Sequence, residues 1–94
     1  MEGKIKLHVL KIQEPYFYDV IGNLKKAELR KNDRNFQEGD LIHFTDVDGY
    51  EFADCVRNIS STLLFRITHV LDASKVIPNL KEHEYVVLSI ERYQ

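Results

Sequence analysis

The chain has 94 residues, a length that fits one domain with one modest hydrophobic core. Its 13 Lys and Arg stand against 15 Asp and Glu, and this net charge of −2 argues against tight, sequence-blind binding of nucleic acid. No apolar run approaches the roughly 20 residues of a membrane helix, and the one cysteine, Cys55, excludes an internal disulfide. We therefore expect a single domain over residues 1–94 in a reducing, cytoplasmic setting, with no membrane partner.

Residues 4–12 are the first predicted element. Polar and apolar side chains alternate there with the spacing of a half-buried strand. The pattern predicts Ile5, Leu7 and Val9 on the core face of this strand.

A short helix is predicted to follow. It begins at Glu14, because Pro15 suits the first helical turn and an acidic residue there complements the helix dipole. Gly22 and Asn23 predict its end. The apolar side chains that share one helical face are Tyr16, Phe17, Val20 and Ile21.

Residues 25–34, which read KKAELRKNDR, are the most informative segment. Five basic side chains stand there against two acidic ones, so the segment is positive in a chain that is negative overall. A strand over residues 25–31 puts Ala27 and Leu29 on one face, and the other face carries Lys26, Glu28, Arg30 and Asn32. These charges favour a site for phosphate or carboxylate, although solvated ion pairs worth about 0–1 kcal/mol each give the same pattern.

The rest of the chain is predicted as strands joined by turns. Strands are expected at residues 41–45, 61–71 and 85–90, with turns at 38–40 and 46–49 and a loop over 72–84. Residues 50–60 are ambiguous between an insertion and a short edge hairpin, in which Tyr50 and Phe52 would offer a platform for base stacking. Together these elements favour a mostly β (α+β) fold, a small and partly open barrel with one or two short helices.

No metal or cofactor is expected. The four histidines, His8, His43, His69 and His83, are dispersed, and no Cys or His pair has the spacing of metal ligands. The four glycines also stand too far apart for a phosphate loop. Residues 60–62, Ser-Ser-Thr, are more typical of a turn that enters a strand than of a catalytic nucleophile.

The segment from Gly22 to Arg30 resembles the signature of the ASCH domain (activating signal cointegrator homology), a branch of the PUA-like superfamily. That signature is a Gly, then a Lys, then Glu-x-Arg, although here Gly22 lies one residue earlier relative to Lys25 and Asn23 stands in its place. The continuation over residues 28–34, Glu-x-Arg-Lys-Asn-Asp-Arg, resembles a small uncharacterised bacterial and phage subfamily. Further matches to that subfamily are Phe36, Gly39–Asp40 and the opening residues His8-Val9-Leu10-Lys11. The resemblance spans nearly the whole chain and implies a small PUA-like β-barrel.

The resemblance implies binding of RNA or a nucleotide in a cleft of mixed charge. Arg30, Lys25, Lys11 and Arg34 would contact phosphate or carboxylate oxygens. Glu28 would orient Arg30 or pair with a base edge. Single-stranded or structured RNA suits such a site better than duplex DNA. The full set of candidate ligand-binding residues is His8, Lys11, Lys25, Lys26, Glu28, Arg30, Lys31 and Arg34.

Two alternatives remain open at the level of sequence. Some ASCH proteins are amidohydrolases that act on an acylated cytidine through a Lys, a Thr nucleophile and a Glu. Lys25 matches that Lys, but Glu28 occupies the position of the Thr, so no catalytic residue is assigned and amidase activity is not expected. The first alternative is nevertheless a small, amidohydrolase-like enzyme that acts on a modified nucleoside, in which Glu28 or His8 would be the acid–base group and Lys25 would stabilise an oxyanion. The other alternative is a protein-interaction module whose charged face docks an acidic partner. The sequence does not decide the oligomeric state, or whether Arg30 pairs with Glu28 or with Asp33.

Overall fold

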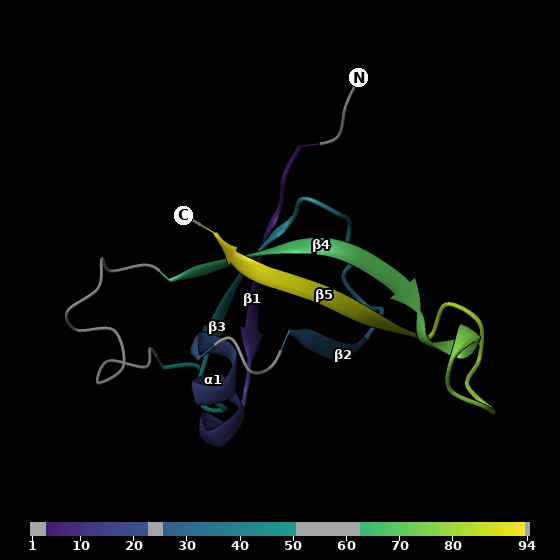
Figure 1. Cartoon of the computed structure of the whole chain (residues 1–94), viewed down its shortest axis with the longest axis horizontal. Helices are drawn as coiled ribbons and strands as arrows, with labels where there is room; N and C mark the ends of the chain where they lie inside the picture. The colour runs from purple at the N-terminus through teal and green to yellow at the C-terminus, as the bar shows by residue number, and fades with distance from the viewer. Residues whose placement is uncertain (1–3, 23–25, 51–62, 94) are drawn as a thin grey trace.

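The computed structural model describes residues 4–22, 26–50 and 63–93. These residues form a mostly β fold with one α-helix, α1 (Glu14–Ile21), and a five-stranded sheet that curls into a half-barrel. The strands are β1 (Leu7–Lys11), β2 (Ala27–Lys31), β3 (Leu41–Thr45), β4 (Leu64–Asp72) and β5 (Tyr85–Tyr93). Figure 1 shows β4 and β5 as a long twisted ribbon, with the short 3-10 helix η1 (Ala73–Lys75) in the loop that joins them. The predicted mostly β, partly open barrel is confirmed.

The order of the strands in the sheet is β1-β3-β4-β5-β2. β1 and β3 run parallel, whereas β3–β4, β4–β5 and β5–β2 are antiparallel pairs. A register shift between Ile67 and His69 interrupts the β4–β5 ladder, and such a bulge increases the twist of a sheet. β1 and β2 are therefore the two edges of the half-barrel.

The hydrophobic core lies inside the curl of the sheet. Ile42, Ile67 and Leu88, from the three inner strands, are completely buried. Helix α1 adds Phe17 and Val20 to the same cluster of buried side chains. Among the described residues, no helix is both long and apolar enough to cross a membrane.

Most predicted elements lie where the sequence placed them. Helix α1 and strand β3 have the predicted bounds, and the turn after β3 closes through a hydrogen bond from Gly49 N to Asp46 O. β5 continues to Tyr93, beyond the predicted end at residue 90, because Leu64 of β4 pairs with Tyr93. The predictions for Lys25, Phe52, Cys55 and residues 60–62 lie outside the described residues.

The prediction for the faces of β1 was wrong. Ile5, Leu7 and Val9 are exposed, and the side chains that point inward are His8, Leu10 and Ile12. The strand takes this orientation because His8 has a buried partner, Asp40, in the turn before β3. A histidine with a hydrogen-bonded carboxylate can be buried, so the polar residue does not mark the solvent face.

Candidate functional site

The two edges of the half-barrel are fastened to each other by arginine side chains. Arg34 Nη1 donates to the carbonyl of Val9 at 3.0 Å, and Arg30 Nη2 donates to the carbonyl of Lys11 at 2.7 Å. Both carbonyls belong to the side of β1 that faces away from β3, because the alternate residues Lys6 and Ile12 make the bonds to β3. We call this junction the seam and define it by Val9, Lys11, Arg30 and Arg34.

Glu28 holds Arg30 in place. Arg30 Nε and Nη2 each lie 2.6 Å from Glu28 Oε2. Glu28 is only 7 % exposed and the Arg30 side chain is 23 % exposed, so the pair is largely withdrawn from water. The partner of Arg30 is thus Glu28, whereas Asp33 lies 3.9 Å from the guanidinium of Arg34.

His8, which precedes the seam residue Val9, forms a second buried polar pair with Asp40. His8 Nε2 lies 2.8 Å from Asp40 Oδ2, and the His8 ring packs on Phe36 with its centroid 4.7 Å away. Asp40 also accepts hydrogen bonds from the backbone N–H groups of Lys6 and Gln37. Burial raises the pKa of the Asp40 carboxyl, but the hydrogen bond from His8 and these two N–H bonds outweigh it and hold the pKa below its usual value.

The sequence-predicted site residues therefore separate into two groups. His8, Glu28 and Arg30 point inward and are paired with other groups of the protein. The exposed residues are Lys11, Lys26, Lys31 and Arg34. Lys11 lies on one side of the seam, and Lys31 and Arg34 follow Arg30 on the other side. Lys25 lies outside the described residues.

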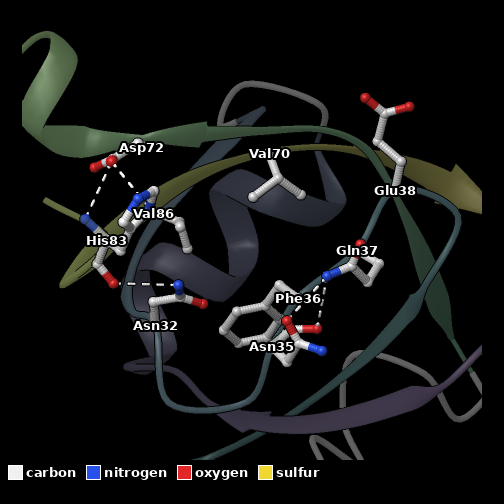
Figure 2. Close-up of a pocket in the computed structure, with 9 residues that line it drawn as sticks. All are labelled: Asn32, Asn35, Phe36, Gln37, Glu38, Val70, Asp72, His83 and Val86. Atoms are coloured by element: carbon white, nitrogen blue, oxygen red, sulfur yellow. Dashed lines mark hydrogen bonds and ion pairs between the residues drawn. The ribbon is translucent and has the colours of Figure 1, made fainter.

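A pocket of about 610 Å³ lies beside the seam (Figure 2). Residues 35–38 and Asn32 form one side of it, and β4, β5 and the loop between them form the other. The sequence analysis missed the lining residues Asn35, Gln37, Glu38, Val70, Asp72, His83 and Val86. A signal was available only for Asn35, Gln37 and Glu38, which lie just after the basic segment, whereas the other four come from residues 70–86.

Hydrogen bonds tie the two sides of this pocket together. Asn32 Nδ2 donates to the carbonyl of His83 at 3.2 Å, and Asn32 N donates to the carbonyl of Glu84 at 2.8 Å. Asp72 accepts from His83 N and from Ser74 N. In the part of the chain that the structure describes, no group of three or more His, Cys, Asp or Glu side chains is placed to hold a metal ion.

Comparison with known proteins identifies the family. The family described as "Domain of unknown function (DUF3850)" matches residues 7–90. The chain belongs to the DUF3850 family. The matched region contains all five strands up to Ile90 of β5, together with the seam and the pocket.

The chain is also similar to two further proteins. An uncharacterised 12.9 kDa protein of Escherichia phage P2 is 43 % identical over 37 residues, or 39 % of this chain, and the match spans about a third (34 %) of that protein. The crystal structure of hypothetical protein PH0355 superimposes with a TM-score of 0.55 over 93 % of this chain and 99 % of its own. The identity to PH0355 is 17 %, so this likeness bears on the fold alone.

Proposed function

We propose that this DUF3850 domain is an ASCH-type, PUA-like module that binds single-stranded RNA or a nucleotide along the seam. The observation that carries the proposal is the exposure of Lys11, Lys31 and Arg34 at a junction whose backbone is fixed by the Glu28–Arg30 pair. A backbone that is already fixed does not have to be ordered when a phosphate binds, so only the side chains lose conformational freedom on association. The overall net charge of −2 limits binding to this local patch.

Within this proposal the basic residues have different tasks. Arg30 is a positioning residue, because its guanidinium is committed to Glu28 and to the Lys11 carbonyl. Arg34 spends Nη1 on the Val9 carbonyl and has further N–H donors for a phosphate, since a guanidinium carries five. Lys11 and Lys31 supply mobile point charges.

Among the described residues, the contacts of the two acid–base candidates do not favour the hydrolase alternative. Glu28, at the position of the Thr nucleophile in the ASCH amidohydrolases, is buried and bonded to Arg30 through Oε2. His8, the other acid–base candidate, is buried and its Nε2 is bonded to Asp40. Neither group is placed to meet a nucleoside at the seam.

The test is the salt dependence of RNA binding. Fluorescence anisotropy of a labelled, short single-stranded RNA would be measured between about 50 and 200 mM salt. Three phosphate contacts, each contributing about 0.7, predict a slope of log affinity against log salt near −2.

Variants test whether that salt dependence arises from cations at the seam. The double variant Lys11→Gln/Lys31→Gln should reduce the magnitude of the slope to about 0.7, because two phosphate contacts are lost. Lys75→Gln removes an exposed cation from η1, outside the seam, and serves as the matched control with an unchanged slope. No binding at millimolar RNA, or binding with a slope near zero, would refute the proposal. Equal effects of Lys75→Gln and the double variant would show that the seam is not the site.

A further inference from the structure

The pocket beside the seam is lined mainly by polar side chains. Figure 2 shows Asn32, Asp72 and His83 toward one end of it and Asn35 and Gln37 toward the other. Its volume of about 610 Å³ lies within the range of small-molecule sites, roughly 300–1,000 Å³. The pocket therefore has room for a ligand, and the chemistry of its lining decides which class of ligand it favours.

Phosphate and a stacked base are both poor occupants of this pocket. Among the described residues that line it, none is Lys or Arg, and the carboxylates of Glu38 and Asp72 repel an anion. Burial raises the pKa of the Asp72 carboxyl, but hydrogen bonds from Ser74 and His83 outweigh it and hold the pKa below its usual value. Asp72 is therefore charged at neutral pH. The Phe36 side chain is only 3 % exposed, so its ring offers no face on which a base could stack.

The side-chain amides of the pocket offer donors and acceptors together. Asn32 Nδ2 gives one N–H to the His83 carbonyl at 3.2 Å, which leaves its second N–H and Oδ1 for a ligand. Gln37 Nε2 donates to Asn35 Oδ1 at 3.0 Å, which leaves Gln37 Oε1 and the Nδ2 group of Asn35. Within the described part of the chain, these remaining amide groups have no hydrogen-bond partner. Each end of the pocket therefore presents a donor beside an acceptor.

A hydroxyl group matches this lining, because it donates and accepts hydrogen bonds through a single oxygen atom. A sugar carries hydroxyl groups without a charge, so the carboxylates of Glu38 and Asp72 do not repel it. Acidic side chains also bind ribose hydroxyls in dinucleotide-binding proteins. In RNA the 2′-hydroxyl is both a donor and an acceptor, and it is the group by which a protein distinguishes RNA from DNA.

The pocket is continuous with the basic residues beside it. Lys31 directly precedes Asn32 and Arg34 directly precedes Asn35, so an exposed cation adjoins a lining amide at two points. In a nucleic-acid strand every internal ribose lies between two phosphates. A strand whose phosphates meet Lys31 and Arg34 would therefore bring a ribose to the amides of Asn32 and Asn35.

We propose that the pocket binds a ribose of that strand through its 2′-hydroxyl, so that the domain prefers RNA to single-stranded DNA. This inference rests on the proposed function, because phosphates on the seam deliver the sugar. The 2′-hydroxyl donates to an amide oxygen, Asn32 Oδ1 or Gln37 Oε1, and accepts from an amide N–H of Asn32 or Asn35. A deoxyribose makes neither hydrogen bond.

Three short single strands of one base sequence test the inference by fluorescence anisotropy. They are RNA, the same strand with 2′-deoxyribose and the same strand with 2′-fluoro groups, and uracil is kept in all three. Because the strands carry the same number of phosphates, the seam predicts the same salt slope for each. We expect RNA to bind about fivefold or more tightly than the other two, because they lack the hydroxyl hydrogen bonds. The 2′-fluoro strand keeps the sugar pucker of RNA, so its weaker binding would assign the preference to the hydroxyl.

A pocket variant gives a second measurement. Gln37→Met removes one amide at an exposed lining residue and leaves the hydrophobic core intact. It should reduce the ratio of RNA affinity to DNA affinity at least about twofold, while the affinity for DNA stays the same. Gln13→Met makes the same change at an exposed residue that does not line the pocket, and it should leave the ratio unchanged.

The outcomes separate this inference from the proposed function. Equal affinity for RNA and the deoxyribose strand, a 2′-fluoro strand that binds as tightly as RNA, or the same ratio in Gln37→Met and Gln13→Met would overturn the inference about the ribose. If RNA then still bound with a salt slope near −2, the seam proposal would stand without it. A preference for RNA that depends on Gln37, together with an affinity that is indifferent to salt, would leave the pocket and remove the seam. No binding of any strand at millimolar concentration would refute both.

Discussion

Loss of the Arg30 guanidinium should cost the domain a large part of its stability. Arg30→Met removes two contacts of 2.6 Å to a carboxylate that is only 7 % exposed, and one hydrogen bond to the Lys11 carbonyl. Leaving a buried charge without its partner typically costs about 3–5 kcal/mol, and the 23 % exposure of the Arg30 side chain places the expected loss near the lower end. A domain of 94 residues has a total stability of about 5–14 kcal/mol, so the loss is a fifth or more of the total.

Urea unfolding followed by circular dichroism measures this loss, and a double-mutant cycle assigns it to the pair. Glu28→Gln alone should also destabilise the fold, while Glu28→Gln/Arg30→Met should be less destabilised than the sum of the single variants, with a coupling above about 1 kcal/mol. The exposed pair Arg66–Glu91, with side chains 47 % and 49 % exposed, is the matched control. Arg66→Met should cost no more than about 1 kcal/mol.

Two outcomes would refute the stabilising role of the Glu28–Arg30 pair. If Arg30→Met costs no more than Arg66→Met, or if the effects of Glu28→Gln and Arg30→Met are additive, then the Glu28–Arg30 pair does not fasten the half-barrel. If Arg30→Met is strongly destabilising but the folded fraction still binds RNA with an unchanged salt slope, Arg30 positions the site without touching phosphate, as proposed.

Two further predictions concern stability. The lowered pKa of Asp40 means that the unfolded chain binds its proton more tightly than the native state, so this contribution is present above the ordinary value of 3.8 and is lost as the pH falls from there through the folded-state pKa. Urea unfolding at a series of acidic pH values should show this fall, and Asp40→Asn should flatten it; an identical acid limb in the variant contradicts the assignment. Asn35→Ala should lose about 1 kcal/mol or more in the same assay, because φ is 51°, whereas Asn35→Gly should lose less; equal losses would show that the left-handed backbone is not the cause.

Elements with local signals were predictable from the sequence. Pro15 near the start and Gly22 at the end of α1 are sufficient to place the helix, and the turn containing Gly39 places the start of β3. The pairing of Glu28 with Arg30 was also within reach, because residues two apart on a strand share a face. In each case the deciding contacts lie within a few residues of one another.

Local sequence patterns could not predict which face of β1 is buried, because the contact that decides it joins residues far apart in the sequence. His8 meets Asp40, 32 residues further along the chain, and this pair reverses which side chains are buried. The pocket could not be predicted for the same reason, since the lining residues Phe36, Val70 and Val86 come from three separate segments of the chain. Alternation alone predicts a strand but does not say which polar residue has a buried partner.

Part of the positive charge of the basic segment, residues 25–34, is used by the fold itself. Of its four described cations, Arg30 and Arg34 donate hydrogen bonds to the carbonyls of β1. These two side chains therefore have fewer N–H donors left for a ligand. A net positive run in sequence therefore overstates the positive charge that is left for a ligand, whereas Lys11, which lies outside the run, is an exposed cation at the seam. Under the proposed function, about three phosphate contacts would give only modest affinity from charge alone, and phosphate contacts carry no sequence information.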